Sequence, residues 1–349
     1  MEDSVIKISG YDLLGSQGKD GIRFAWHYLY NDMFVESAAF HQRSTRISDN
    51  ICGYTTSVSA GCMLKSFNSH CLFCRTGSLL PFCGPLSYYD IAKQNIFMVL
   101  ADMYCDDHTF LHNRPREFAY MGQGEPGLSY SQLRLAIEIT NRAMKELGQS
   151  VYRHVFATSG VPEAIIAFKN DIKNFYTERV TLHFSLHATY NRELIMPIER
   201  LYSYKTVLQA LDDIHAISGE KPCIGIMLFD HFYSHRNKVQ YSNGFKEIKQ
   251  ILSELDPQKH RLSFCEYNPS DDICRASKYS SINAEKILLY AKELGFEAKL
   301  FSSFGKEEQT ACGMLAGKKP EQSASQKWRT LEKQAEELVH YCSRFDQNT

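Results

Sequence analysis

The sequence predicts an α/β fold built on a parallel sheet, and two observations support this prediction. From about residue 54, short apolar runs with the length of buried strands alternate with longer amphipathic segments of helical periodicity. Polar or glycine-rich motifs follow one predicted strand after another. Six strand–helix repeats imply right-handed crossovers in a sheet that is either doubly wound or curved into a barrel. In both architectures, active sites form at the carboxyl ends of the strands.

The elements follow in order along the chain. The first twenty residues are polar and glycine-rich, and the two strand-like runs that follow predict a β-hairpin turning at Asn31-Asp32. The hairpin strands are predicted at 23–30 and 33–40, and the later strands at 54–59, 117–121, 153–158, 180–186, 223–229, 261–267 and 296–303. Helices are predicted near 87–104, 129–147, 161–172, 204–217, 243–255, 281–294 and 322–343.

The helix near 129–147 illustrates the assignment. Its apolar residues fall on one helical face, and Gly148 is placed to end it. Taken together, the elements predict an N-terminal extension with a hairpin (1–50), a strand–helix unit (51–320) and a C-terminal helix (321–349).

Composition limits the functional classes. The chain has 349 residues, 44% of them hydrophobic, which suffices for a substantial core. A net charge of −1 gives no global attraction to nucleic acid. No apolar run is long enough to span a bilayer, and the start at Met1-Glu2-Asp3-Ser4 lacks the pattern of a secretory signal. We therefore expect a cytoplasmic protein whose 11 cysteines are thiols and ligands and not disulfides.

A cysteine triplet follows the first strand of the repeats. Cys62, Cys71 and Cys74 have the spacing C-x8-C-x2-C. Three neighbouring thiolates can hold three irons of a 4Fe–4S cluster and leave the fourth iron open to a small molecule. The triplet therefore predicts a potentially catalytic iron–sulfur centre.

Further motifs stand at the ends of later strands. They are G-Q-G-E-P (122–126), T-S-G (158–160), S-L-H-A (185–188) and N-P (268–269). Each by itself is typical of a turn or a helix cap. Their succession at strand ends indicates a shared site.

These motifs resemble those of radical S-adenosylmethionine (SAM) enzymes, and more narrowly of the RlmN/Cfr class, the adenine-C2 and adenine-C8 methyltransferases of ribosomal RNA. The resemblance runs from about Arg23 to Gly317. It rests on M-G-Q-G-E-P (121–126), F-S-L-H (184–187), M-P-I (196–198) and A-C-G-M-L-A-G (311–317).

The resemblance implies a partial (β/α)6 TIM-like barrel in which the cysteine triplet binds a 4Fe–4S cluster and SAM chelates the open iron. It places Gly124 and Glu125 at the methionine amino group of SAM, a charge-assisted contact. The rest of the SAM site would be lined by Phe73, Ser159, Ser185, Leu186, His187 and Asn268. An external electron donor such as flavodoxin or ferredoxin is also implied, and we expect a monomer.

In this class a methyl group is first placed on a cysteine, which corresponds to Cys312 here. A deoxyadenosyl radical from a second SAM then takes a hydrogen from the S-methyl group, and the carbon radical adds to the ring. A glutamate on the hairpin later removes the ring proton, and Glu36 in V-E-S is the candidate for this base. An exposed hairpin glutamate without that role is the alternative.

The chain departs from the class in three ways. The first cluster gap is eight residues instead of three, which costs only about 0.9 kcal/mol in loop closure. The class has a resolving cysteine seven residues before the first ligand, where this chain has Thr55; Cys52 is the nearest thiol, and Cys83 is a second possibility. Where the class carries a helical RNA-gripping domain before the hairpin, this chain has about twenty residues.

Three hypotheses follow for the function. The first is methylation of an sp² carbon through Cys312, with an RNA adenine as substrate. The second is the same chemistry on a peptide or a small-molecule heteroaromatic. The third is a non-catalytic scaffold that binds RNA or a partner protein.

Overall fold

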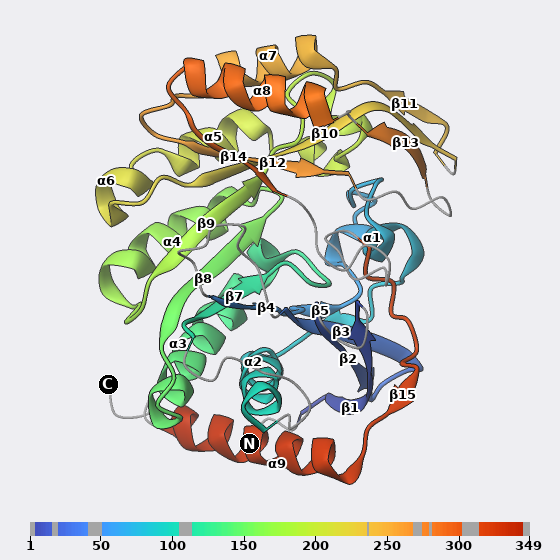
Figure 1. Ribbon diagram of the computed structural model, residues 1–349, viewed down its shortest axis with the longest axis vertical. Helices are drawn as coiled ribbons and strands as arrows, with labels where there is room; N and C mark the ends of the chain where they lie inside the picture. The colour runs from blue at the N-terminus through green and yellow to red at the C-terminus, as the bar shows by residue number, and fades with distance from the viewer. Residues whose placement is uncertain are drawn as a thin grey trace.

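One large mixed sheet organises the molecule, with most helices on its outer side (Figure 1). The computed structural model describes residues 4–15, 20–40, 51–104, 114–235, 237–267, 274–278, 281–301 and 314–344. Within these residues the main sheet contains 13 strands, and a second sheet pairs β5 (Ser59–Ala60) with β6 (Gly84–Pro85).

The parallel part of the main sheet matches the predicted repeats. Its neighbouring strands are all parallel. They are β4 (Cys52–Thr55), β7 (Arg116–Tyr120), β8 (Val151–Thr158), β9 (Val180–Ser185), β10 (Cys223–Ser234), β12 (Arg261–Glu266) and β14 (Glu297–Phe301). The connecting helices are α2 (Tyr88–Tyr104), α3 (Tyr130–Glu146), α4 (Pro162–Asn174), α5 (Tyr204–Leu211), α6 (Ile214–Ser218), α7 (Phe245–Ser253) and α8 (Ser281–Glu293). The α/β class with a large, mostly parallel sheet is thus confirmed.

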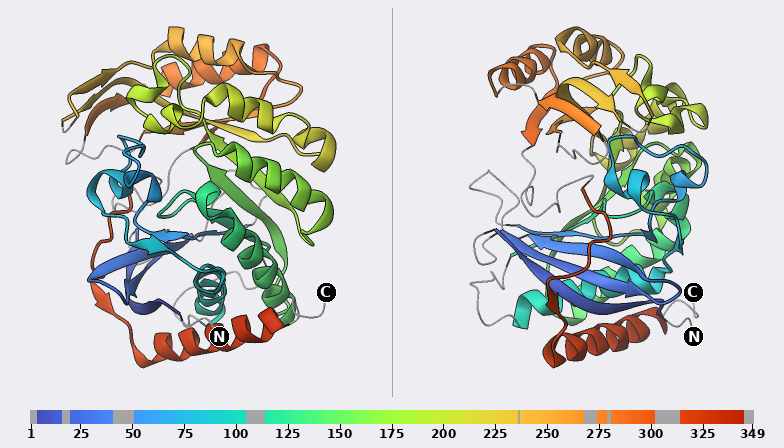
Figure 2. Two further views of the ribbon diagram at one scale, coloured as in Figure 1. Left: turned by 180° about the vertical axis from the view of Figure 1, so that it is seen from behind. Right: turned by 90° about the vertical axis from the view of Figure 1, so that its right-hand side faces the viewer.

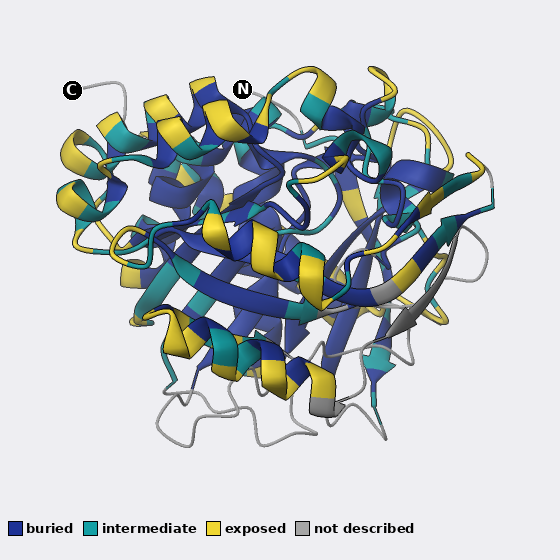
Figure 3. Ribbon diagram, turned by 90° about the horizontal axis from the view of Figure 1, so that it is seen from above, coloured by how far each residue is buried: buried dark blue, intermediate teal, exposed yellow. Residues whose placement is uncertain are grey.

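The helices bury one face each against this sheet. In α3 the buried residues include Leu133, Ala136, Ile137 and Met144, which are on the predicted apolar face. Figure 3 shows the same division along the outer helices, whose exposed stripes face away from the sheet. The single helix predicted at 204–217 is interrupted at Asp212-Asp213, where Asp213 takes a left-handed φ of 72°.

The N-terminal extension contains more sheet than predicted. Strands β2 (Gly21–Tyr28) and β3 (Met33–Phe40) form the expected hairpin, but the loop between the paired residues Tyr28 and Met33 has four residues instead of two. A strand that was not predicted, β1 (Ile6–Leu14), pairs with β2. Its buried positions include Gly10 and Asp12, which weaken the apolar alternation that marks a half-buried strand.

The C-terminal helix packs against α2, α3 and β1. Helix α9 (Gln326–Ser343) runs beneath α2 and α3 and beside β1 (Figures 1 and 2). Short strand β15 (Gln322–Ser323) pairs with β1 just before it. Helix α2 is therefore enclosed on nearly all sides, which explains why even Asp90, Lys93 and Asn95 are buried in it.

Further short elements surround the carboxyl ends of the parallel strands. They are η2 (Met63–Lys65), α1 (Arg75–Leu79), η3 (Pro126–Ser129), η4 (Arg192–Leu194), η5 (Pro197–Arg200), β11 (Val239–Tyr241) and β13 (Cys274–Lys278). Strands β11 and β13 both pair with the second half of β10, which explains why β10 extends beyond the predicted 223–229. Among the described helices, none is long and apolar enough to cross a membrane.

Candidate functional site

The long cysteine gap folds into an ordered turn. Cys62 precedes η2, and the turn ends at Asn68, which has a left-handed φ of 52°. The Ser69 amide donates to the Leu64 carbonyl at 2.8 Å, which is the closing bond typical of a helical C-terminus. Lys65 Nζ donates to the Ser78 carbonyl of α1 at 2.7 Å. The extra residues therefore form a closed unit tied to α1, with Phe67 half exposed on its surface.

The three thiols lie near one another. Burial raises the pKa of the Cys62 thiol, and the neighbouring Cys74 raises it further, while the backbone amides of Leu64 and Lys65 oppose this by hydrogen bonding to the sulfur. Burial also raises the pKa of the Cys71 thiol, and the nearby thiols of Cys74 and Cys62 raise it further. Such mutual repulsion of thiolates, in a buried loop with amide donors, suits a cationic metal group.

The described residues contain no group of three or more His, Cys, Asp or Glu side chains gathered tightly enough for a metal ion. A 4Fe–4S cluster is larger than one ion, so thiolates that ligate three of its irons stand farther apart than the ligands of a mononuclear site. The absence of such a tight group among the described residues therefore does not count against Cys62, Cys71 and Cys74 as candidate cluster ligands.

The G-Q-G-E-P loop packs directly on the strand that leads into the cysteine loop. Gly124 has a φ of 107°, and a Cβ there would lie 2.3 Å from Ser59 Oγ, so only glycine fits. Gln123 contributes its backbone carbonyl, which accepts from the Val58 amide at 2.9 Å. The strand-end motif and the cysteine loop are thus one packed unit.

Glu125 joins this unit to the end of β8. Its carboxylate accepts hydrogen bonds from the Ser159 amide at 2.9 Å, from Thr158 Oγ1 at 2.5 Å and from the Gly127 amide at 2.8 Å. Ser159 Oγ also donates to it. Because Glu125 is buried, its carboxylate needs these donors to replace water. The same hydrogen bonds connect the loop after β7 to the end of β8.

The end of β9 is organised by His187, which has a left-handed φ of 57°. Its Nδ1 accepts from the Met227 amide at 3.1 Å, so a neutral ring carries its proton on Nε2. Burial lowers the pKa of His187 to about 3, with Arg192 and His183 adding to the shift. The ring contacts Phe73 of the cysteine loop edge-to-face at 5.3 Å between centroids. Phe73 of the cysteine loop and His187 after β9 are therefore in direct contact.

Arg192 is a site residue that the sequence analysis missed. It is 1% exposed, and it donates to the carbonyls of Ser159 and Leu186 at 2.8 and 2.9 Å. It also donates to the Ser185 carbonyl at 3.1 Å and to Glu199 at 2.8 Å. Burial lowers its pKa, while Glu199 and Cys71 raise it. One guanidinium thus connects the ends of β8 and β9 beside the cysteine loop, although an arginine in a loop gives no local signal of burial.

Glu36 is not an exposed hairpin residue. It is 1% exposed and forms an ion pair with Arg23. Its Oε2 accepts from the Gly317 amide at 2.6 Å and from Gln123 Nε2 at 3.1 Å. Glu36 therefore lies between the G-Q-G-E-P loop and the segment that follows Cys312.

The remaining predicted residues are placed as follows. Cys52 starts β4 at its amino end, and burial followed by the Asp102 charge raises its pKa to about 11. That position does not support Cys52 as the resolving thiol, because it lies at the opposite end of β4 from the candidate site and burial disfavours the thiolate form that such a thiol needs. Cys83 lies after α1, with its sulfur 3.4 Å from Met33 Sδ. Cys312 and Asn268 lie outside the described residues.

The chain is similar in sequence to curated proteins. The chain is 28% identical over 224 residues to a probable dual-specificity RNA methyltransferase RlmN of Flavobacterium johnsoniae, which covers 60% of this chain and 56% of that protein. It is 25% identical over 299 residues to the corresponding protein of Thermosipho melanesiensis, covering 85% of this chain and 76% of that protein. The chain is therefore similar in sequence to proteins named as probable RlmN RNA methyltransferases. No family model matches it.

A solved structure shares the fold. A crystal structure of a radical SAM methyltransferase from Sphaerobacter thermophilus superposes with a TM-score of 0.71 at 17% identity, covering 90% of this chain and 82% of that one. The predicted resemblance and fold class are therefore confirmed.

Proposed function

We propose that this chain is an RNA methyltransferase of the radical SAM type that transfers a methyl group to an adenine sp² carbon through Cys312. The observation that supports this most is the junction of the cysteine loop with three strand ends. Phe73 contacts His187, Gly124 packs on Ser59, and Glu125 holds Ser159. The RlmN name of the relatives supplies the substrate class.

In this proposal Cys62, Cys71 and Cys74 hold a 4Fe–4S cluster, which supplies the single electron needed to cleave SAM. Glu125 and Arg192 set the positions of the strand-end backbone groups against which SAM would lie. His187, neutral at physiological pH, presents an Nε2–H donor and no charge. Burial of these groups excludes water from the reacting atoms.

Cys312 carries the methyl group in this proposal, and Glu36 accepts the ring proton at its carboxylate. The support for Glu36 is its position: its Oε2 lies 2.6 Å from the Gly317 amide, five residues after Cys312. Because Cys52 is remote, Cys83 is the better candidate for the thiol that releases the product.

The experiment is anaerobic purification followed by mass spectrometry of the peptide that contains Cys312. We expect an S-methyl mark on Cys312, absent in Cys62→Ala and retained in Cys342→Ala, a matched control whose cysteine is buried in α9. Unmodified Cys312 in cluster-loaded protein supplied with SAM would refute the cysteine intermediate.

The substrate is tested with the same preparation. Transfer of a labelled methyl group to adenine in RNA supports the proposal. Transfer to a peptide or a small heteroaromatic compound would support the proposed chemistry and refute RNA as the substrate. Absence of SAM cleavage by cluster-loaded protein would leave a binding scaffold.

A further inference from the structure

The segment 314–321, which we call the strap, follows Cys312 and leads to β15. Its first residues contact the helix that begins after the third cysteine of the triplet. Thr76 Oγ1 donates to the Leu315 carbonyl at 2.7 Å, and Arg75 donates to the Met314 carbonyl at 3.4 Å. The strap therefore starts beside the cysteine loop.

Three buried charged side chains lie under the rest of the strap, one on each strand of the N-terminal extension. Asp12 of β1, Arg23 of β2 and Glu36 of β3 are 5%, 1% and 1% exposed. Asp12 is directly opposite Arg23 in the sheet, and Arg23 Nε donates to Asp12 Oδ2 at 2.7 Å. Arg23 NH1 donates to Glu36. We call these three residues the clamp.

Each clamp residue binds a different backbone group of the strap. Glu36 Oε2 accepts from the Gly317 amide at 2.6 Å, and Asp12 Oδ1 accepts from the Glu321 amide at 2.6 Å. Arg23 NH1 donates to the Lys318 carbonyl at 3.0 Å. The strap is thus held at three points within five residues.

The energetics favour a positioning role over a stabilising one. A buried ion pair or triad is often replaceable by packed apolar side chains without loss of stability. An apolar trio, however, could not bind the amides of residues 317 and 321 or the carbonyl of residue 318. The charged side chains of the clamp are therefore explained by the backbone groups of the strap that they bind.

The clamp is also connected to the cysteine loop. Gln123 Nε2 donates to Glu36 Oε2 at 3.1 Å, and Gln123 Oε1 accepts from the Gly61 amide at 3.4 Å. Gly317 has a φ of 66°, and a Cβ there would lie 3.1 Å from the Phe34 carbonyl of β3. Strap, β3 and cysteine loop therefore share one set of close contacts.

We propose that Asp12 and Arg23 are positioning residues that hold the strap, which follows Cys312 in the sequence, beside the cysteine loop. The chemical meaning of this placement rests on the proposed function, whereas the clamping itself does not. Neither residue would touch the substrate.

The first test is amide hydrogen exchange followed by mass spectrometry on anaerobically purified protein. We expect peptides covering 314–321 to exchange at least tenfold faster in Arg23→Met, and in Asp12→Asn, which is nearly isosteric and is the second variant should the first fail to fold. Arg116→Met is the matched control, because it removes another fully buried arginine from an ion pair, with Asp102 at the amino end of the sheet. Unchanged strap exchange in folded Asp12→Asn would overturn the proposal.

The second test measures how much 5′-deoxyadenosine forms per methylated product. A loosened strap should raise this ratio about tenfold in Asp12→Asn while the visible spectrum of the cluster stays unchanged. A merely destabilising change would lower both products together, and that outcome would overturn the role in positioning. If wild-type protein shows no methyl mark on Cys312 but strap exchange accelerates as expected, the proposed function fails and the clamp stands.

Discussion

At the scale of single residues, Arg192 contacts several parts of the candidate site, although the sequence did not single it out. Its guanidinium binds carbonyls at the ends of β8 and β9 as well as Glu199. A lysine has one ammonium and cannot reproduce this planar set of bonds. We expect Arg192→Lys to fold and to bind SAM roughly 10- to 100-fold more weakly, since hydrogen bonds to charged groups contribute about 1.5–3 kcal/mol each.

Equilibrium binding of SAM to cluster-loaded protein measures this effect. The matched control is Arg153→Lys, which alters a partly buried arginine paired with Glu117 on the preceding strand. Equal SAM affinity in Arg192→Lys and wild type would contradict the role of Arg192 in organising the SAM site.

His154 is one of the buried histidines, with His187, whose protonation should lower stability in acid. It is fully buried, its Nδ1 lies 2.9 Å from the Tyr120 hydroxyl, and its Nε2 lies 2.7 Å from Asn141 Oδ1. Burial lowers the pKa of His154 to about 3. Between this value and the ordinary value of about 6.5, the unfolded chain binds a proton that the folded chain does not, so stability falls as the pH decreases through this window.

The expected loss is about 1.4 kcal/mol per pH unit for this one group. Urea unfolding at pH 7 and pH 5 checks it. His154→Gln should be less stable at pH 7 and should depend less on pH by about one proton. An unchanged pH dependence in this variant would show that other groups cause the acid sensitivity.

At the scale of elements, the site depends on the packing of the G-Q-G-E-P loop against β5. Gly124 and Gly148 both have positive φ, 107° and 64°, but a Cβ at Gly124 would lie 2.3 Å from Ser59 Oγ while a Cβ at Gly148 would meet nothing within 4 Å. Gly148→Ala therefore isolates the backbone cost, about 1–2 kcal/mol. Gly124→Ala adds a steric clash on top of it.

We expect Gly124→Ala to lose iron binding and Gly148→Ala to retain it. Iron and sulfide content after anaerobic reconstitution, with the melting temperature of each variant, measures this difference. Comparable iron loss in both variants would mean that the contact with β5 is not what supports the cysteine loop.

The elements themselves were largely predictable. All seven parallel strands and their connecting helices lie close to the predicted positions, because buried strands and amphipathic helices each leave a local periodicity. Strand β1 was missed, since Gly10 and Asp12 occupy buried positions that the apolar pattern needs. The cysteine turn was expected as an insertion, but its closure by Ser69 and Lys65 depends on contacts that spacing alone does not reveal.

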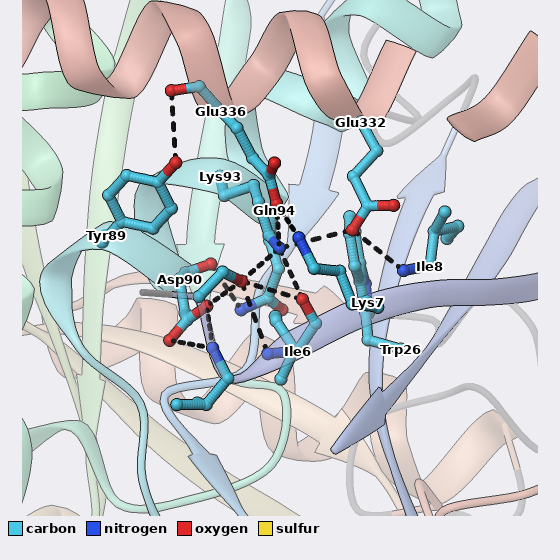
Figure 4. Close-up of polar contacts among 12 residues, drawn as sticks. Ile6, Lys7, Ile8, Trp26, Tyr89, Asp90, Lys93, Gln94, Glu332 and Glu336 are labelled. Atoms are coloured by element: carbon cyan, nitrogen blue, oxygen red, sulfur yellow. Dashed lines mark hydrogen bonds and ion pairs between the residues drawn. The ribbon is translucent and has the colours of Figure 1, made fainter. Parts of the chain in front are cut away.

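At the scale of the whole molecule, one buried lysine fastens the C-terminal helix to the N-terminal strand. Lys93 of α2 lies 3.4 Å from Glu332 and 3.2 Å from Glu336 of α9, and it donates to the Ile6 carbonyl of β1 at 2.5 Å (Figure 4). Glu332 also accepts from the Ile8 amide at 3.1 Å. Three segments far apart in the sequence therefore converge on one ammonium.

We expect Lys93→Met to destabilise the protein by about 3–5 kcal/mol, because it leaves the buried carboxylate of Glu332 without its cationic partner. Lys7→Met is the control: Lys7 pairs with Glu336 as well, but its side chain is 46% exposed, so its loss should cost at most about 1 kcal/mol. Denaturant unfolding measures both variants. Equal destabilisation by the two changes would contradict the importance of burial.

The sequence by itself determined the order of strands and helices and the edge of the sheet at which the motifs gather. It could do so because secondary-structure periodicity is local and because parallel strands end on the same side. Only the tertiary structure decided that Arg192 joins two strand ends, that Glu36 is buried beside the strap, and that Cys52 lies at the other end of its strand. These features arise from contacts between distant residues, and a buried charge is recognisable only by the partners that compensate it.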